Sequence, residues 1–204
     1  MRSDKIINNK KQLELILEKI PPHPKPRYEL EQYLTPGDLV ATILWTAYLR
    51  GDIKGKTVAD LGCGTGKFCS GITALGGYCL CVEIDINSLN VAKEFVDENA
   101  EFINADIRFL NLRKVDTVVQ NPPFGVVNKG IDLIFLEKAL QIANVVYSIH
   151  KSNEQSRKII LGKAKEYGFS VEVISTKYKL KPYYPWHIKK AHEFLVDVFL
   201  FKKS

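Results

Sequence analysis

The sequence contains no apolar run long enough to cross a membrane. A spanning helix needs about 18 or more consecutive apolar residues, and the longest apolar stretches, residues 39–49 and 131–146, are interrupted by polar side chains before that length. The N-terminus leads into a charged amphipathic stretch and lacks the apolar core and small-residue cleavage site of a signal peptide. These absences exclude a membrane-spanning role and predict a cytoplasmic protein.

Cysteine is scarce, and its spacing is not that of a metal site or of a disulfide framework. Cys63, Cys69, Cys79 and Cys81 include no Cys-x-x-Cys pair and have no histidine nearby. Cys79 and Cys81 are two residues apart on a predicted strand and should point to the same side. We therefore interpret all four as small core residues and predict no metal.

The composition is that of one ordinary soluble domain, without repeats or low-complexity tracts. The 204 residues are 46% apolar and 25% charged, which argues against a disordered, collagen-like or coiled-coil chain. Positive charge is concentrated at one end, because residues 1–150 have a net charge of −1 and residues 151–204 a net charge of +7. A localised basic surface favours a polyanion such as nucleic acid, and a lysine-rich solvated face accounts for the charge equally well.

A short N-terminal segment precedes the main domain. Apolar residues recur every three to four positions over residues 13–20, which predicts an amphipathic helix. Four prolines in residues 21–26 end this helix and should keep the next stretch extended, as a strap across the main body. We therefore treat residues 1–26 as an N-terminal helix and strap, and residues 27–204 as the main domain.

Strand-like and helix-like patterns then alternate along the chain. Thr35 and Pro36 predict a capped helix that ends near Leu49. The alternation that follows predicts a Rossmann-like α/β fold, with a seven-stranded, mostly parallel sheet, an antiparallel last strand and helices on both faces. The predicted strands are 57–61, 78–82, 102–105, 115–120, 144–149, 169–175 and 194–201, and the predicted helices between the early strands are 67–75, 87–98 and 129–143.

A glycine-rich loop follows the first predicted strand. Residues 62–66, Gly-Cys-Gly-Thr-Gly, lie between a strand and a helix, where glycine allows the backbone to turn tightly and approach a ligand. A dinucleotide-binding loop has the spacing G-x-G-x-x-G, whereas this loop has G-x-G-x-G and follows Asp60. An acid in that position disfavours a pyrophosphate and favours a positively charged cofactor, a sulfonium or an ammonium.

Acidic residues also end the next two strands. Glu83, 17 residues beyond Gly66, is placed to accept the hydroxyl groups of a ribose, with Asp85 as the second choice. Asp106 follows the third strand and can accept the amine of an adenine. Each acid taken alone fits a helix N-cap or a solvated loop end equally well, but acids at three successive strand ends favour a nucleoside site. With the glycine loop, they make residues 30–204 resemble the class I, S-adenosylmethionine-dependent methyltransferases.

The fourth strand runs directly into Asn121-Pro122-Pro123-Phe124, which we predict to be catalytic. The two prolines fix their φ angles, so the Asn121 side chain and the Pro122 carbonyl are held as acceptors for an NH2 group. Such hydrogen bonds strengthen as positive charge develops on the nitrogen, and Phe124 can stack on the ring. The alternative is a simple turn. The tetrad resembles the motif of amino-methyltransferases that act on adenine N6, guanine N2 or glutamine amide, and phenylalanine favours a nucleobase.

Basic and aromatic residues near the C-terminal end predict an RNA surface. The fifth strand ends at the same sheet edge as Asn121, and the loop before the last strand interleaves aromatic and cationic residues. Rings can stack on bases while cations contact phosphates, although packing of the rings against the sheet is an equally good interpretation. The predicted RNA-binding residues are Lys151, Trp186, His187, Lys189 and Lys190.

Four segments narrow the resemblance, namely residues 30–36, 121–125, 146–152 and 187–190. Together they are similar to the methyltransferase-like-five group of small-subunit ribosomal RNA adenine-N6 methyltransferases, over nearly the whole chain. The resemblance implies N6 methylation of an adenosine in small-subunit ribosomal RNA and a partner, a small zinc-ribbon activator protein that pairs with the sheet edge.

Cofactor contacts are implied for Gln32, Thr35, Gly62, Thr65, Glu83, Asp106 and Ile107, and Asp60, Gly64 and Asn121 complete the predicted cofactor-binding set. The chain departs from the eukaryotic members of this group at two of these positions. It has Glu83 where they have aspartate, and Thr65 where they have cysteine. Both substitutions keep the chemistry plausible.

Three other functions remain open. A guanine-N2 methyltransferase for ribosomal or transfer RNA would use the same tetrad and the same basic surface. A protein glutamine-N5 methyltransferase of the release-factor type is disfavoured by Phe124 and by residues 32–35. A non-enzymatic RNA-binding scaffold would have a damaged glycine loop or tetrad, and both are intact.

Overall fold

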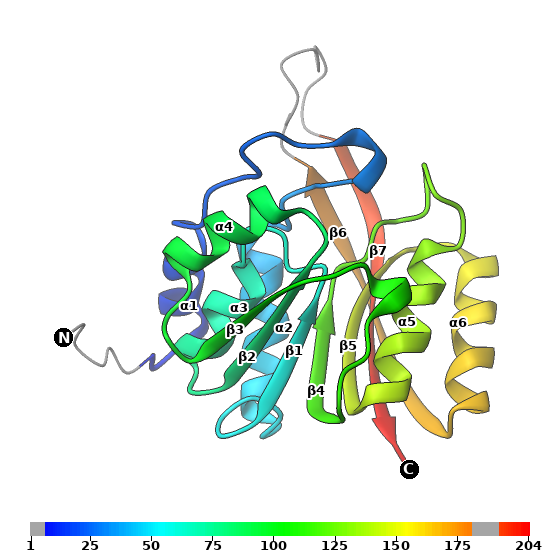
Figure 1. Cartoon of the computed structure of the whole chain (residues 1–204). Coiled ribbons are helices and arrows are strands. Elements are labelled where there is room, and N and C mark those ends of the chain that lie inside the picture. Colours follow the sequence, from blue (N-terminus) through cyan, green and yellow to red (C-terminus); the bar gives the residue numbers. More distant parts are fainter. Residues whose placement is uncertain (1–6, 181–191) are drawn as a thin grey trace.

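The alternating strand and helix patterns produce one mixed sheet covered on both faces (Figure 1). The computed structural model describes residues 7–180 and 192–204. The strands are β1 (Thr57–Leu61), β2 (Tyr78–Glu83), β3 (Ala100–Asn104), β4 (Val115–Gln120), β5 (Ala143–Lys151), β6 (Phe169–Leu180) and β7 (His192–Lys203). The helices are α1 (Lys10–Leu17), α2 (Gly37–Leu49), α3 (Lys67–Ala74), α4 (Ile86–Phe95), α5 (Ile131–Ile142) and α6 (Glu154–Glu166), with 3-10 turns η1 (Tyr28–Leu30) and η2 (Ile107–Phe109).

The strand order is β3-β2-β1-β4-β5-β7-β6. Strands β1 to β5 pair in parallel, and β7 runs antiparallel to both of its neighbours, β5 and β6. The predicted seven-stranded, mostly parallel sheet with an antiparallel last strand is therefore confirmed. Within the described part of the chain, no helix is both long and apolar enough to span a membrane.

Three local features differ from the sequence expectations. Helix α6 was not predicted, and β6 continues five residues beyond the predicted end at residue 175. The expected N-cap at Thr35 is wrong, because Pro36 is the cap residue of α2 and makes no side-chain cap bond. The Thr35 hydroxyl is instead engaged by the side chain of Asn121, 86 residues further along the chain.

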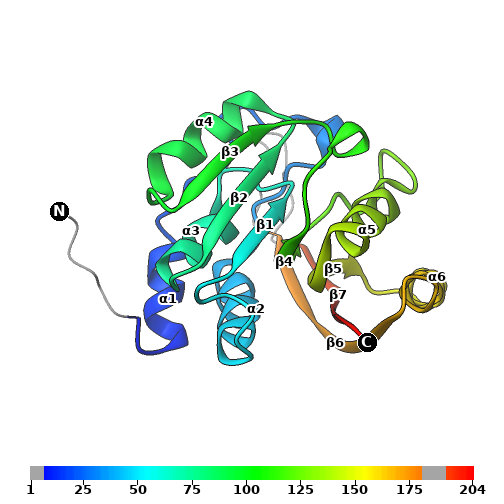
Figure 2. The same ribbon diagram turned by 60° about the horizontal axis from the view of Figure 1, so that its bottom comes forward.

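The sheet separates two apolar layers (Figure 2). Side chains alternate along β1, so that Val58 packs with α1 to α4 on one face while Ala59 and Leu61 pack with α5 and α6 on the other. Helix α1 belongs to the first layer, because Leu13 and Leu17 are fully buried there. The two layers hold the carboxyl ends of the central strands at one common edge.

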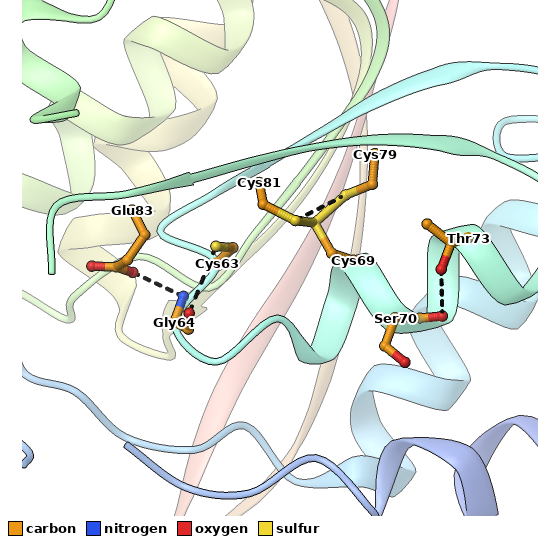
Figure 3. Close-up of a disulfide and its surroundings, with 8 residues drawn as sticks. All are labelled: Cys63, Gly64, Cys69, Ser70, Thr73, Cys79, Cys81 and Glu83. Carbon is orange, nitrogen blue, oxygen red and sulfur yellow. Dashed lines mark hydrogen bonds between the residues drawn. A yellow bond between two sulfur atoms is a disulfide. The ribbon is translucent and has the colours of Figure 1, made fainter. Parts of the chain in front are cut away.

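The four cysteines are buried, which confirms their interpretation as core residues. Cys79 and Cys81 point to the same side of β2, as expected. The sequence spacing did not indicate their neighbour, because both sulfur atoms meet that of Cys69 on α3 (Figure 3).

The contact between α3 and the first two helices gives a stability prediction. A Cβ at Gly71 would overlap Leu44 on α2 and lie 3.2 Å from Leu17 Cδ2 on α1. Gly71→Ala should therefore lower the free energy of unfolding by about 1–3 kcal/mol, because the fully buried side chains of Leu44 and Leu17 must shift within a packed layer. The control is Gly162→Ala on α6, where a Cβ meets nothing within 4 Å, and a gain of about 0.5–1 kcal/mol is expected. Urea unfolding curves measure both, and equal effects at the two positions would contradict the prediction.

Candidate active site

A cavity of about 450 Å³ lies at the edge where β1, β2 and β4 end. Its volume is within the range of small-molecule sites. The strand order reverses between β1 and β4, which is where open α/β sheets bind their ligands. The cavity is lined by nine of the ten predicted cofactor-binding residues: Gln32, Thr35, Gly62, Gly64, Thr65, Glu83, Asp106, Ile107 and Asn121.

The glycine loop is held against the end of β2 by one carboxylate. Gly64 N–H donates to Glu83 Oε2 at 2.8 Å, and Asp85 N–H donates to Glu83 Oε1 at 2.9 Å. Gly62, Gly64 and Gly66 have φ values of 76°, 55° and 86°, in the region that favours glycine. Burial raises the pKa of Glu83. Each carboxylate oxygen keeps a lone pair for a further donor, so Glu83 can hold the loop and accept a ribose hydroxyl at the same time.

Asp60 is the predicted cofactor residue that the structure leaves outside the cavity wall. The alternation along β1 turns its side chain away from Ala59 and Leu61, into the layer formed by α1 to α4, where it is fully buried. Burial, and then the charge of Glu83, raise its pKa well above the ordinary aspartate value. The raised pKa favours the neutral carboxyl group, and Asp60 makes no direct contact with the cavity.

The third acid is already paired with a neighbouring cation. Arg108 Nε donates to both carboxylate oxygens of Asp106 at 3.0 Å, and the hydrogen bond from Arg108 is the main reason that the pKa of Asp106 is lowered. An adenine amine at this place would share the carboxylate with Arg108. Ile107, the next residue, is buried and lines the cavity.

The segment before α2 folds over the glycine loop. Gln32 donates to Asp85 Oδ2 at 2.9 Å and accepts from the backbone amide of Arg27 at 2.8 Å, so both ends of its amide are engaged. Thr65 donates its hydroxyl to the Pro21 carbonyl at 2.7 Å. Burial tends to raise the pKa of Asp85, but the hydrogen bonds from Gln32 and Ser88 outweigh it, and the pKa is lowered. The proline-rich strap is therefore part of the cavity's surroundings.

The amide of Asn121 has one engaged end and one unengaged end. Its Nδ2 donates to Thr35 Oγ1 at 2.9 Å and to the Tyr178 hydroxyl at 3.0 Å. Its Oδ1 is buried and has no hydrogen-bond partner in the part of the chain that the structure describes. Tyr178 is fully buried, and this burial raises its pKa to about 12. Asn121 thus presents a fixed, unpartnered acceptor at the cavity.

Asn121 and Pro123 line the cavity, whereas Pro122 and the half-buried Phe124 are not among its lining residues. Phe124 packs edge-on against Tyr178 and Phe194, with ring centroids 5.7 and 5.6 Å apart. Tyr178 and Phe194 stack on each other at 5.2 Å. These two rings fix Phe124 from β6 and β7.

Sequence reasoning missed Tyr178 as a site residue. The predicted strand ended at Ser175, three residues before it. A signal was present, because polar and apolar residues alternate from Lys177 to Leu180. Of the predicted RNA-binding residues, Lys151 is exposed at the end of β5. Trp186, His187, Lys189 and Lys190 lie outside the described residues.

The comparisons with known proteins identify the family of this chain. The family model of the methyltransferase small domain matches residues 38–144. The chain is 36% identical to the rRNA N(6)-adenosine-methyltransferase METTL5 of Danio rerio, over 94% of this chain and 97% of that protein. It is 35% identical to Mettl5 of Drosophila melanogaster, over 94% of this chain and 95% of that protein. The chain belongs to the METTL5-like methyltransferases.

A solved structure supports the same conclusion for the fold. The crystal structure of a candidate RNA methyltransferase from Pyrococcus horikoshii matches with a TM-score of 0.89 and 39% identity, over 97% of this chain and 98% of that one. Family membership confirms the predicted enzyme class and its cofactor, S-adenosylmethionine. The residues present fit this cofactor, because the cavity is large enough and Glu83 lines it with carboxylate oxygens that keep lone pairs for a further donor.

The role of Glu83 can be tested with one isosteric change. Glu83→Gln leaves a single oxygen for the amides of Gly64 and Asp85 and removes the charged acceptor for the ribose. The Kd for S-adenosylhomocysteine, measured by calorimetry, should rise about 10- to 100-fold. The control is Glu101→Gln on β3, where the amide oxygen can still accept the exposed hydrogen bond from the Tyr78 hydroxyl and only the charge is lost. An unchanged Kd in Glu83→Gln would contradict the assignment.

His23 on the strap gives the protein a pH-dependent stability. His23 Nδ1 lies 2.6 Å from the Ser88 hydroxyl, and burial lowers the pKa of the imidazole from 6.5 to about 4. The unfolded chain therefore takes up a proton near pH 6.5, while the folded chain does so only near pH 4. The stability contributed by neutral His23 is complete above pH 6.5 and is lost as the pH falls to about 4, an effect of roughly 3 kcal/mol.

The measurement compares wild type with His23→Gln, which cannot gain a proton. The difference in unfolding free energy between the two proteins should change by roughly 3 kcal/mol between pH 6.5 and pH 4. Carboxylates other than Asp85, whose pKa depends in part on His23, titrate alike in both proteins and cancel in the difference. Parallel pH profiles would show that His23 is not buried as a neutral side chain.

Proposed function

We propose that the chain transfers a methyl group from S-adenosylmethionine to the N6 amine of an adenosine in small-subunit ribosomal RNA, in the cytoplasm. The observation that carries this proposal is the buried, unpartnered Asn121 Oδ1 at the cavity. A buried oxygen without a hydrogen-bond partner favours a ligand that donates a hydrogen bond, such as one with an NH2 group. Relatives of nearly equal length that are named rRNA N6-adenosine methyltransferases support adenine as the base and ribosomal RNA as the polymer.

The reaction requires the adenine amine, which is a poor nucleophile, to attack the methyl group. The cofactor supplies an electrophilic methyl group on a sulfonium, and the lone pair of an adenine amine is delocalised into the ring. Asn121 Oδ1 accepts an N–H of the amine, and the Pro122 carbonyl is the second acceptor. Both hydrogen bonds strengthen as the nitrogen gains positive charge, so they stabilise the transition state more than the bound substrate. The methylated nitrogen is acidic and loses its proton to solvent without a strong base.

The surroundings of the tetrad keep these acceptors in place. Thr35 and Tyr178 hold the Asn121 amide in one orientation. Phe124, supported by Tyr178 and Phe194, provides a ring surface beside the acceptors. A base must leave its stack to reach this site. We propose that Lys151, with Trp186, His187, Lys189 and Lys190, contacts the flanking RNA.

The open edge of the sheet supports the proposal of a partner. Strand β3 is an edge strand, and such edges are templates for pairing with another chain. Large apolar side chains are exposed on the elements that adjoin it, including Phe109 at 82%, Ile84 at 45% and Phe95 at 38%. We propose this edge as the binding site of the zinc-ribbon activator.

The roles of Asn121 and Tyr178 can be separated by kinetics. Asn121→Ala should lower kcat by about 10²–10³-fold with little change in the Kd of the cofactor, because its bond acts mainly in the transition state. Tyr178→Phe keeps the aromatic packing but removes one of the two acceptors of Asn121 Nδ2, and kcat should fall about tenfold. The control is Tyr147→Phe, which removes a hydroxyl bonded to Asp52 at 2.7 Å, away from the cavity. Wild-type turnover in Asn121→Ala would rule out the proposed role.

The proposed function is tested by its product. The purified protein is incubated with S-adenosylmethionine and small-subunit ribosomal RNA, and the RNA is digested and analysed by mass spectrometry of nucleosides. We expect N6-methyladenosine in wild type and none in Asn121→Ala. N2-methylguanosine as the product would show that the protein is a guanine-N2 methyltransferase instead. Methylated glutamine in added protein, with unmodified RNA, would show that the protein is a glutamine-N5 methyltransferase instead. Repeating the assay with cell extract supplies the activator if the protein alone is inactive.

A further inference from the structure

Three cysteines from two different elements converge beside the cofactor loop. Cys69 lies on α3, and Cys79 and Cys81 lie on β2 (Figure 3). All three side chains are fully buried, and their sulfur atoms lie within 4.8 Å of one another. The Cα atom of Cys69 is 5.6 Å from that of Cys79 and 6.3 Å from that of Cys81. Both separations are within the range that a disulfide spans without backbone movement.

The charge of the surroundings distinguishes a disulfide from a metal site. The three cysteines belong to the apolar layer between the sheet and α1 to α4. Within the described residues, no fourth His, Cys, Asp or Glu joins the group. A zinc ion takes four ligands, and three thiolates around it would leave a net negative charge in this layer, at high cost. A disulfide is neutral and apolar, and needs no further ligand.

We propose that Cys69 forms a disulfide with one of the two cysteines of β2, with the other as an alternative partner, and that this cross-link clamps the cofactor loop. One sulfur forms only one disulfide, so one of Cys79 and Cys81 keeps its thiol. The free thiol lies beside the linked one, with the two sulfur atoms 3.9 Å apart. Its thiolate can attack the Cys69 sulfur and release the other cysteine as a thiolate, an exchange that needs no net oxidation.

The first cross-link requires an oxidant, which we infer to be a small-molecule disulfide. Two S–H bonds of the protein are lost and one S–S bond is formed. The two electrons and two protons pass to the small disulfide, which is reduced to two thiols through a mixed disulfide. This takes place before α3 packs on the sheet, while the thiols are still accessible. Burial then protects the bond from reductants in solution.

The position of the cross-link explains what it would do. Cys69 is three residues after Gly66, the last glycine of the loop, and Cys81 is two residues before Glu83. The bond therefore joins the helix that follows the loop to the strand that ends in the loop's anchor, in parallel with the hydrogen bond from Gly64 to Glu83. The start of α3 and the end of β2 are therefore fixed relative to each other before a ligand arrives. This lowers the entropic cost of ordering the glycine loop when the ligand binds. This effect on the cofactor rests on the proposed function, whereas the cross-link itself does not.

The cross-link is detected by counting free thiols. Wild-type protein is unfolded in excess N-ethylmaleimide, so that free thiols are blocked before they exchange, and its intact mass is measured with and without prior reduction. We expect two of the four cysteines to react without reduction and all four after it. Trypsin leaves Cys69, Cys79 and Cys81 in one peptide, residues 68–93, whereas chymotrypsin separates Cys69 from the other two at Tyr78. Fragmentation of the chymotryptic peptides between Cys79 and Cys81 then identifies the partner, because the cysteine that is not linked carries the maleimide.

Serine variants supply matched controls. Cys79→Ser and Cys81→Ser should each keep the cross-link through the remaining partner. Cys69→Ser and the double variant Cys79→Ser/Cys81→Ser should lose it, and the Tm should fall by about 5–10 °C relative to the single β2 variants. The Kd for S-adenosylhomocysteine should rise about threefold or more in the two variants that lose the bond and stay near the wild-type value in the two that keep it.

The outcomes separate the two proposals. Four reactive thiols in unreduced wild type would overturn the cross-link, as would a stoichiometric metal ion in elemental analysis that Cys69→Ser fails to bind. A cross-link with equal Kd values in all four variants would overturn the clamp. If the thiol count confirms the disulfide but wild type binds no S-adenosyl ligand, the proposed function fails and the disulfide stands.

Discussion

The parallel pairing of β1 with both β2 and β4 determines where every part of the site lies. These three strands carry the glycine loop, Glu83 and Asn121 at their carboxyl ends. Because the strands are parallel and in register, the three features meet at one edge although they are spread over 60 residues of chain. The pairing also divides the core into two layers. The interaction that builds the core is thus the one that assembles the cavity.

A buried polar network then closes the cavity from the N-terminal side. Residues 18–36 contain one 3-10 turn and no other regular element, so their position depends on side chains. Gln32, Asp85, Ser88 and His23 are linked in sequence by hydrogen bonds of 2.6–2.9 Å. Each bond is shielded from water, and breaking one leaves a buried group without its partner, at a cost of about 1–3 kcal/mol. Such a network holds an irregular segment in one position, which apolar contacts alone would not do.

The parts of the structure that local patterns encode were predictable. Every strand, and the position of the glycine loop, Glu83 and the Asn-Pro-Pro-Phe tetrad at strand ends, followed from periodicity and motif. Helix α6 was missed because only Ile160 and Ala164 among its residues are buried, which leaves a weak amphipathic signal. The bond of Tyr178 to Asn121 depends on the pairing of β6 with β7, and the meeting of Cys69 with β2 depends on how α3 packs. Such contacts arise from tertiary structure, and no local spacing specifies them.

The orientation of the Asn121 amide connects this architecture to substrate choice. The two ends of an amide have nearly the same shape, so hydrogen-bond partners alone decide which end faces the cavity. Thr35, from the N-terminal segment, and Tyr178, from β6, both accept from Nδ2, and Oδ1 remains buried without a hydrogen-bond partner in the described part of the chain. A buried acceptor without a partner is costly, and a ligand that donates an N–H removes that cost. A purine with a carbonyl at the same position presents a second acceptor and leaves the cost in place, so under the proposed function the site would distinguish an amino group from an oxo group before any methyl transfer takes place.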